Sequence, residues 1–232
     1  MKRPQDFDAQ GMNGMSRPSK MIGSAIKMLV SSKEASQVIG PAGATIKSIS
    51  EMSGATLHLS SKFELYPGTQ MQELSLKSAS PDSVMSGVLQ VLAKLSEETG
   101  KVLGGEWDVE EGGARLHFIL PTLAARSVIG KGGETIKMLR ASSGMKVHVE
   151  EISIGEGEMA EQVVSLAGPL MGVQIALPTL LEKIAECVML PWFTNWAYNV
   201  NAAGGKGGGK GMDKGMMKGK GKGKGKDFGR CG

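Results

Sequence analysis

The chain of 232 residues is poor in aromatic residues and in cysteine, and each shortage excludes a class of protein. Aromatic residues make up 4% of the sequence, so the core must be mostly aliphatic. The two cysteines, Cys187 and Cys231, cannot build a disulfide framework, which fits a reducing compartment. The sequence has no apolar run of about 18 residues, so we expect no transmembrane helix and no membrane partner. Residues 1–20 also lack the apolar segment of a secretory signal peptide.

Positive charge is scarce in the middle of the chain and concentrated at its ends. Residues 204–232 hold eight Lys and one Arg against two Asp, whereas residues 21–203 hold 14 basic and 19 acidic side chains. The sequence pI of about 9.0 is therefore weak evidence for nucleic-acid binding by a folded part. Only local clusters of charge can support such a function.

A stretch of ten residues occurs twice. It reads VIGPAGATIK from Val38 to Lys47 and VIGKGGETIK from Val128 to Lys137, with seven of the ten positions identical. The hydrophobic periodicity around both copies predicts the same β-α-α-β-β-α order, and therefore an internal duplication. The expected elements of the first copy are a strand at 26–30, helices at 33–39 and 44–52, strands at 55–59 and 71–76, and a helix at 80–98. Those of the second copy are a strand at 115–120, helices at 122–129 and 134–142, a strand at 145–149, an acidic loop at 150–161, a strand at 162–166, and a helix at 169–186 that could divide near Pro178.

The remaining segments differ in composition from the two units. Four aromatic residues between Trp192 and Tyr198 predict a segment that docks on the second unit, or alternatively a patch for a protein partner or self-association. The alternating Gly and Lys residues that follow cannot form a core. We expect a flexible segment at 1–23, domains at 24–98 and 114–186 with a linker at 99–113, an aromatic extension at 187–203, and a disordered tail at 204–232.

The glycine break between the paired helices limits the chemistry. It lacks the G-x-x-x-x-G-K-[ST] pattern of a P-loop. A dinucleotide fingerprint would need glycine where Thr135 stands and a strand, not a helix, before the break. The remaining interpretation is a helix–GxxG–helix clamp, in which bare backbone and the first-turn amides of the next helix meet a phosphate.

The pattern Ile-Gly-x-x-Gly-x-x-Ile between two short helices, in this element order, resembles the type I KH domain. Both units carry it, and they look most similar to the Nova and poly(C)-binding branch, because the segment from Phe63 to Thr69 resembles the variable loop of a first Nova-type domain. The resemblance implies an α+β fold of two KH domains, each with a three-stranded antiparallel sheet packed on three helices.

The resemblance also implies a site, in which the GxxG backbone lies against about four unpaired nucleotides and the bases enter an aliphatic groove. The residues expected to bind RNA in the second unit are Arg126, Val128, Ile129, Gly130, Lys131, Gly132, Gly133, Ile136, Lys137, Arg140, Lys146, Val147 and Val149. Their counterparts in the first unit are Val38, Ile39, Gly40, Gly43, Ile46, Lys47 and Leu57.

The first unit departs from the pattern. Its break is Gly-Pro-Ala-Gly, in which Pro41 has no amide hydrogen and neither middle residue is basic. It could therefore bind weakly or serve as a scaffold, and the sequence leaves both open.

The expected function is sequence-selective binding of single-stranded RNA in pre-mRNA splicing or mRNA regulation, in the nucleus or the cytoplasm. The alternatives are single-stranded DNA binding in transcription and a protein-interaction scaffold. We expect no enzyme, no cofactor and no metal, because no nucleophile–base pair emerges and neither His58 nor His148 has partners at metal-ligand spacing. The Gly/Lys tail is expected to add attraction for phosphates that does not depend on sequence.

Overall fold

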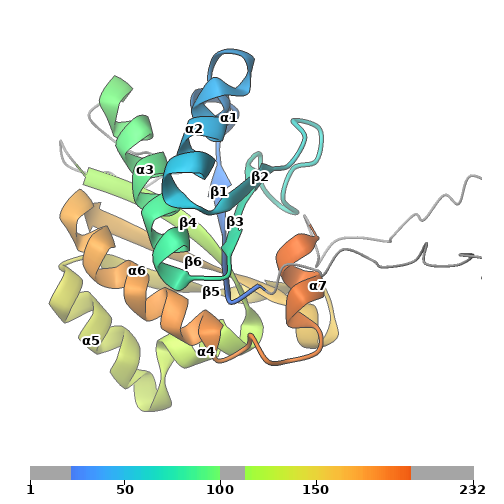
Figure 1. Ribbon diagram of the computed structural model, residues 1–232. Coiled ribbons are helices and arrows are strands. Elements are labelled where there is room, and N and C mark those ends of the chain that lie inside the picture. The colour runs from blue at the N-terminus through green and yellow to red at the C-terminus, as the bar shows by residue number, and fades with distance from the viewer. Residues whose placement is uncertain (1–21, 100–112, 200–232) are drawn as a thin grey trace, which may run out of the picture.

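Two copies of one β-α-α-β-β-α unit build the fold, which we describe from a computed structural model for residues 22–99 and 113–199 (Figure 1). The first copy comprises β1 (Ser24–Val30), α1 (Ser32–Ile39), α2 (Ala44–Ser53), β2 (Thr56–Leu59), β3 (Gln72–Ser78) and α3 (Pro81–Thr99). The second comprises β4 (Gly113–Pro121), α4 (Thr122–Ile129), α5 (Glu134–Ser143), β5 (Lys146–Ile154), β6 (Glu161–Pro169) and α6 (Leu170–Ala185), and α7 (Phe193–Tyr198) follows.

The two units share one sheet. In the described residues its strand order is β2-β3-β1-β4-β6-β5, with the two units joined where β1 pairs antiparallel with β4. Met28 lies opposite Phe118 at this junction, so positions 90 apart in the sequence are related by a local two-fold axis. The expected α+β fold of two KH-type units is confirmed, but the sequence did not predict that their three-stranded sheets join into one.

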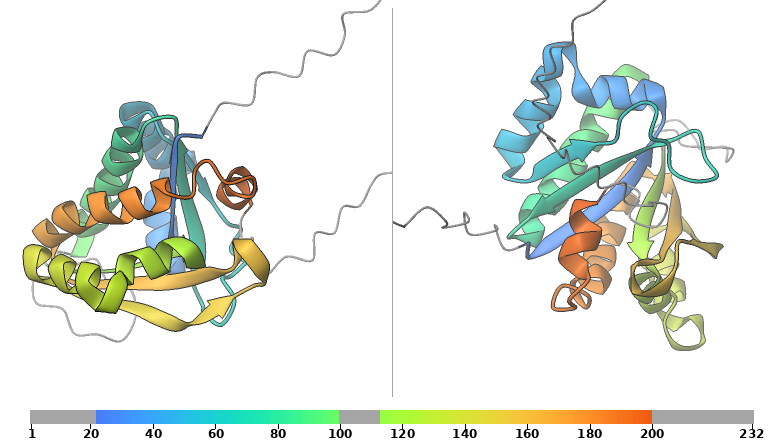
Figure 2. Two further views of the ribbon diagram at one scale, coloured as in Figure 1. Left: turned by 90° about the horizontal axis from the view of Figure 1, so that it is seen from below. Right: turned by 90° about the vertical axis from the view of Figure 1, so that its right-hand side faces the viewer.

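Strand alternation divides the sheet into two faces. Ile26, Met28 and Val30 of β1 belong to the main core, which the helices cover, whereas Leu29 belongs to a separate cluster with Tyr66 and Ile119. Figure 2 shows α7 on the side of the sheet opposite α3 and α6. We call the side on which α7 lies the open face.

Local sequence signals explain where the helices begin and end. Ser31 and Glu34 form a capping box at the start of α1, with the Glu34 amide donating to Ser31 Oγ and the Ser31 amide donating to Glu34 Oε2. Gly54 and Gly144 end α2 and α5 in the left-handed conformation, as their position in the sequence predicts.

Two of the expected elements were wrong in detail. Residues 150–154 were expected in the acidic loop but continue β5 beyond an irregularity between Val149 and Ser153. A strand is possible there because its acidic side chains are exposed on the edge of the sheet, where water solvates them. Pro178 does not divide α6, which runs unbroken through it. The side chain of Pro178 is exposed, so water can reach the carbonyl that its missing N–H leaves without a helical partner.

The aromatic segment folds back on both units. Phe193 and Trp196 of α7 are fully buried, and α7 contacts β1 of the first unit. The expected docking on the second unit is confirmed, because the Trp196 indole N–H donates to Glu161 of β6, and the contact with the first unit was not expected. Self-association through the whole segment is not supported, because these two side chains already pack inside the chain.

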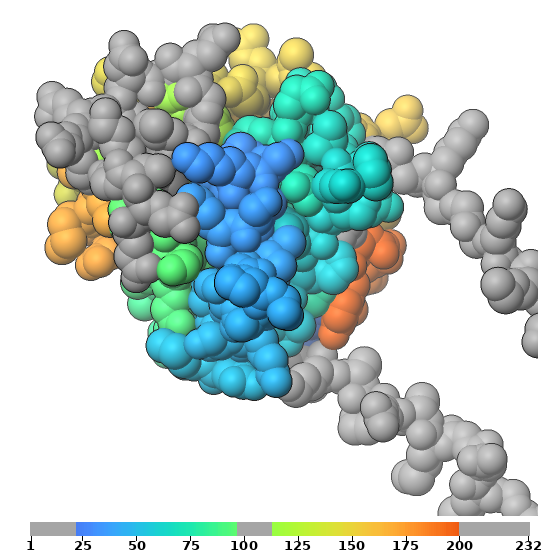
Figure 3. All heavy atoms as spheres, turned by 90° about the horizontal axis from the view of Figure 1, so that it is seen from above, coloured from blue at the N-terminus to red at the C-terminus, as the bar shows by residue number. Residues whose placement is uncertain are grey.

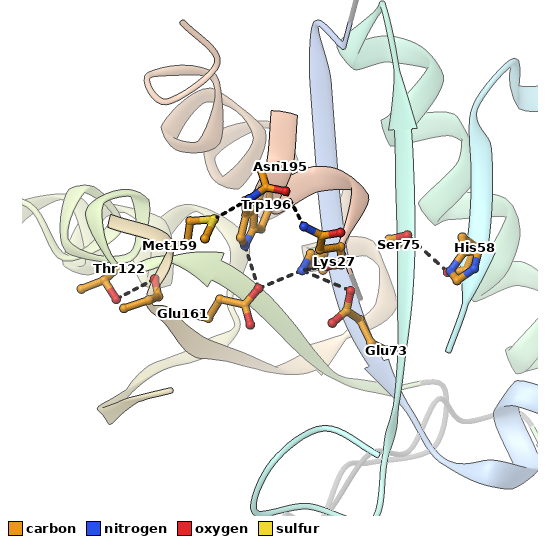
Figure 4. A network of polar contacts seen from close by, with 11 residues as sticks. Lys27, His58, Glu73, Ser75, Thr122, Met159, Glu161, Asn195 and Trp196 are labelled. Atoms are coloured by element: carbon orange, nitrogen blue, oxygen red, sulfur yellow. Dashed lines mark hydrogen bonds and ion pairs between the residues drawn. The ribbon is translucent and has the colours of Figure 1, made fainter. Parts of the chain in front are cut away.

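A buried charge network lies under α7 and joins the two units (Figure 4). Lys27 Nζ lies 2.8 Å from Glu161 Oε1, 2.9 Å from the Asn199 carbonyl oxygen and 3.2 Å from Glu73 Oε1. The Trp196 indole N–H donates to Glu161 Oε1 at 2.7 Å. Burial raises the pKa of the Glu161 carboxyl, and the charge of Lys27 opposes that rise.

Candidate nucleic-acid interface

The glycine that begins each clamp loop is required by contact and by conformation. Gly130 has φ 73°, and a Cβ there would lie 2.2 Å from Thr135 Oγ1. Gly40 in the first unit has φ 68°, and its Cβ would lie 2.0 Å from Thr45 Oγ1. The repeated threonine therefore packs beneath the repeated glycine, which explains why both recur.

The loop backbone of the second unit is open to a phosphate. Within the part of the chain that the structure describes, no side chain caps α5, whose N-cap is Gly133. A Cβ on Gly132 would also meet no described atom within 4 Å. Two amides here are already bonded, that of Gly133 to the Gly130 carbonyl oxygen at 3.2 Å and that of Glu134 to the Lys131 carbonyl oxygen. The rest of the loop backbone is open to an anion.

The loop of the first unit has nearly the same shape. Ala42 lies at φ 50° and ψ 24°, close to Gly132 at φ 62° and ψ 16°. Pro41 and Ala42 therefore preserve the turn but remove one loop amide hydrogen and the positive charge.

Cationic side chains distinguish the two clamps more than backbone shape does. Arg126, Lys131, Lys137, Arg140 and Lys146 are all exposed in the second unit. Of these five positions the first unit keeps only Lys47, whose Nζ lies 3.8 Å from Glu51 Oε1. The other four counterparts are Ser36, Pro41, Ser50 and Thr56.

Arg140 is oriented by the backbone of β5. Its Nε and Nη2 both donate to the Val147 carbonyl oxygen, at 3.0 and 2.6 Å. The guanidinium is thereby held where α5 meets β5, at the wall of the groove. In the first unit Ser50 Oγ instead donates to the Ala55 carbonyl oxygen at 2.6 Å, so no cation stands there.

Lys146 is the predicted cation that the structure separates from the clamp. Along β5, Val147 and Val149 are buried while Lys146 and His148 are exposed, so Lys146 projects from the open face. It is therefore placed apart from Lys131 and Lys137, which flank the start of α5.

The predicted apolar residues fall into two groups. Ile39 and Ile129 are exposed by 39% and 36%, beside the two clamp loops, and Ile46 and Leu57 are partly buried. Val38 and Val128 have no exposed surface, so they cannot touch a base in this conformation and support the groove from beneath. The same applies to the nearly buried Ile136, Val147 and Val149.

Two other kinds of site, a metal centre and a membrane span, are not found in the described residues. In 22–99 and 113–199, no three His, Cys, Asp or Glu side chains are placed to hold a metal ion. None of the helices in these ranges is long and apolar enough to cross a membrane. The predicted linker and the Gly/Lys tail lie outside the described residues.

Sequence reasoning missed one feature of the first unit. Lys62 and Phe63, on the loop after β2, border a hollow of about 580 Å³ next to α1. The available signal was an aromatic residue directly beside a lysine, in a chain with few aromatics.

Comparison with known proteins identifies the repeated unit. A family model described as the KH domain matches residues 25–93 and 115–182. RNA-binding protein Nova-2 of Homo sapiens is 27% identical over 187 residues, which cover 77% of this chain and 38% of Nova-2. RNA-binding protein Pasilla of Drosophila melanogaster is 26% identical over 165 residues, which cover 69% of this chain and 21% of Pasilla. The chain thus spans well under half of either relative.

Solved structures give a more distant match. Dim2p from Pyrococcus horikoshii OT3 is 19% identical, with coverage of 74% of this chain and 97% of that chain, and a TM-score of 0.24. The same organism's a/eIF2alpha-aDim2p-rRNA complex matches with 19% identity, coverage of 69% and 85%, and a TM-score of 0.25. At these TM-scores neither match bears on how the two units are arranged.

Proposed function

The chain belongs to the KH-domain family, and from that premise we propose that it binds single-stranded RNA through the clamp of its second unit. One observation carries the proposal: an uncapped start of α5 behind an open glycine loop, surrounded by exposed cations. Backbone amides and helix polarity favour an anion at this place, and cations add attraction for phosphates. The cations that would serve are Arg126, Lys131, Lys137 and Arg140.

The groove beside this clamp favours unpaired nucleotides. Its exposed apolar residue, Ile129, can contact the face of a base, and Arg140 presents a guanidinium whose position is fixed by Val147. Base edges are accessible to such groups only where the strand is not paired. Sequence selectivity would arise from the shape of this groove and from the hydrogen bonds of Arg140.

The shared sheet separates the two clamps. Each groove lies beside an outer strand, β2 or β5, and five strand spacings between them amount to about 24 Å. The local two-fold axis makes the two grooves run in opposite directions. One RNA that occupied both would have to turn back on itself, so we propose that the second unit binds first and the first unit adds contacts where the strand can reach it.

The biological role follows from the relatives and is likewise proposed. Nova-2 and Pasilla are named as RNA-binding proteins. We propose a non-catalytic role in pre-mRNA splicing or mRNA regulation, carried out in the nucleus or the cytoplasm.

Selection from a random single-stranded RNA pool with the full chain tests this function. We expect enrichment of short unpaired motifs, and weaker binding to the DNA version of an enriched sequence, because the 2′-hydroxyl distinguishes the two. Equal or tighter binding to the DNA would favour the DNA alternative. No binding to the pool at low salt would contradict the proposal and favour a protein-interaction scaffold.

A further inference from the structure

The loop between β2 and β3 of the first unit holds an aromatic ring out in solvent. Phe63 is exposed by 84% in a chain with only ten aromatic residues among 232. The loop projects from the sheet beyond β2 (Figure 1). Single exposed apolar residues are common on protein surfaces, so the case for a binding role rests on how this ring is held and on what surrounds it.

Hydrogen bonds fix the base of this loop. The Gln72 side-chain amide donates to the Ser60 carbonyl oxygen at 2.7 Å, and the Glu73 amide donates to Ser60 Oγ at 3.0 Å. Ser60 Oγ in turn donates to the Glu64 carbonyl oxygen at 2.9 Å. These bonds close the loop around residues 61–63, so the backbone that bears the Phe63 ring is ordered.

The far side of the loop is anchored to the junction of the two units. Tyr66 is 1% exposed and packs with Leu29 of β1 and Ile119 of β4 on the open face. Its amide donates to the Met71 carbonyl oxygen at 2.8 Å. Because the loop is held at both ends, binding at Phe63 costs little ordering entropy.

The surroundings of the ring suit a nucleobase. Lys62 Nζ lies 4.9 Å from the centre of the Phe63 ring, so a positive charge stands beside an aromatic face. The adjoining hollow of about 580 Å³ is lined by apolar residues and by the polar residues Ser32, Ser36, Ser60, Ser61 and Gln72. Ile39, which precedes the clamp loop, is also part of its wall, so the hollow lies next to the first unit's clamp.

Two carboxylates on the neighbouring segments accept backbone amides, which fixes their position and leaves their negative charge in place. Glu34 Oε2 accepts the Ser31 amide at 2.7 Å, as part of the cap of α1. Glu64 Oε2 accepts the Ser61 amide at 3.4 Å. Figure 3 shows the end of the molecule formed by α1 and α2, with the β2–β3 segment beside them.

We propose that Phe63 and Lys62 form a nucleobase-stacking site, in which the ring stacks on an unpaired base and the ammonium meets the adjoining phosphate. This site rests on the proposed RNA binding and gives the first unit a way to bind without a charged clamp. A base has a flat apolar face, hydrogen-bonding edges and a linked anion, which the ring, the serines and Lys62 match. An apolar peptide would use the ring and the hollow but not the cation.

The second unit does not repeat this feature. The segment from Glu150 to Ala160 contains no aromatic residue, and its exposed apolar side chain is Ile152, at 75%. The two units therefore divide the work, with cations concentrated in the second and the stacking surface in the first. Ile152→Ala provides a matched control, because it removes an exposed apolar side chain near the equivalent loop.

The test uses the full chain and single-stranded homopolymeric RNAs that carry 2-aminopurine, whose fluorescence falls when it stacks. Phe63→Ala should weaken binding by at least about fivefold, the lower end of the range measured for base–aromatic stacking. It should also abolish the fluorescence quenching, while Phe63→Trp retains both and Ile152→Ala changes neither. Lys62→Gln should lower the log–log salt slope by about 0.7.

The outcomes separate this inference from the proposed function. If the unmodified chain binds RNA but Phe63→Ala keeps full affinity and quenching, the stacking site is wrong and the clamp stands. Binding of an apolar peptide that displaces no RNA, together with RNA affinity unchanged by Phe63→Ala, would assign the ring to a protein partner. Since Phe63 is exposed, melting temperatures equal to that of the unmodified chain serve as the control for folding.

Discussion

Lys27→Met should destabilise the whole fold, because it removes the cation of a buried network that spans both units. The lysine has no exposed surface and lies within 3.2 Å of carboxylate oxygens from β3 and β6. Methionine fills the aliphatic volume, so the destabilisation comes mainly from the buried carboxylates. Glu161 loses its ion-pair partner, whereas Glu73 keeps the charge of Lys77 nearby. Removing one partner of a buried ion pair costs about 3–5 kcal/mol, against a total stability of about 5–15 kcal/mol for a domain.

The loss should depend on pH in a defined direction. Burial already raises the pKa of Glu161, and Lys27 holds it down, so the substitution raises that pKa further. The folded variant then binds more protons than the unfolded chain above the ordinary pKa of a carboxyl, and its stability falls as pH rises. Urea denaturation near pH 5 and near pH 8 should therefore show a larger loss at the higher pH.

A second substitution provides the matched comparison. Adding Glu161→Gln to Lys27→Met keeps an acceptor for the Trp196 indole but removes one buried charge. The double variant should regain part of the stability and lose much of the pH dependence. A cost below about 1 kcal/mol for Lys27→Met, or an equal cost at both pH values, would refute the role given to the network.

Three further predictions concern the two clamps and the tail. Ala42→Gly should stabilise the chain by about 1 kcal/mol, because Ala42 is the one non-glycine residue with positive φ in the part of the chain described. Urea denaturation measures this, and an unchanged midpoint would contradict it. Arg140→Ser, which copies Ser50 of the first unit, should weaken binding to a selected RNA about tenfold, roughly the value of a hydrogen bond from a charged group. An equal loss of affinity for all RNA sequences would show that Arg140 has no role in selectivity. Deleting residues 204–232, with eight Lys and one Arg, should lower the log–log salt slope by about 0.7 for each phosphate that the tail neutralises. The deletion should lower the affinity for all RNA sequences equally. A loss of affinity for one sequence alone would contradict this role of the tail.

The order of the elements could be predicted because it depends on local patterns. Gly54 and Gly144 end helices, and residues 122–129 form the helix that their periodicity indicates. Short-range signals of this kind remain visible when only one sequence is available.

The union of the two units could not be predicted because it depends on distant partners. Lys27 reads as the solvent-facing residue of a half-buried strand, yet it is buried by residues from β6 and α7, with Glu161 134 positions away. Nothing in the sequence around Ile26 and Met28 marks β1 as the strand that pairs with β4. Such pairing is decided by long-range packing, which leaves no local pattern.

The candidate site was predictable in its backbone and less so in its side chains. The glycine spacing located both clamp loops, and the offset of 90 positions showed which cations the first unit lacks. Burial was harder to foresee, since Val128 and Ile129 are neighbours with similar chemistry but differ in exposure, at 0% and 36%. The difference in exposure depends on how α4 is rotated about its axis relative to the sheet.

RNA binding by Gly132→Asp and by Ala42→Asp, compared in the full chain, tests the central claim most directly. Both positions lie at the tip of a clamp loop with positive φ, which aspartate tolerates, and a Cβ at position 132 meets no described atom within 4 Å. Gly132→Asp places a carboxylate against the phosphate site and should weaken binding to single-stranded RNA at least about tenfold, roughly 1.4 kcal/mol. Ala42→Asp should cost clearly less, since the first unit has few cations to oppose. Circular dichroism should show both variants folded, and unchanged affinity for folded Gly132→Asp, or an equal loss for Ala42→Asp, would contradict unequal roles for the two clamps.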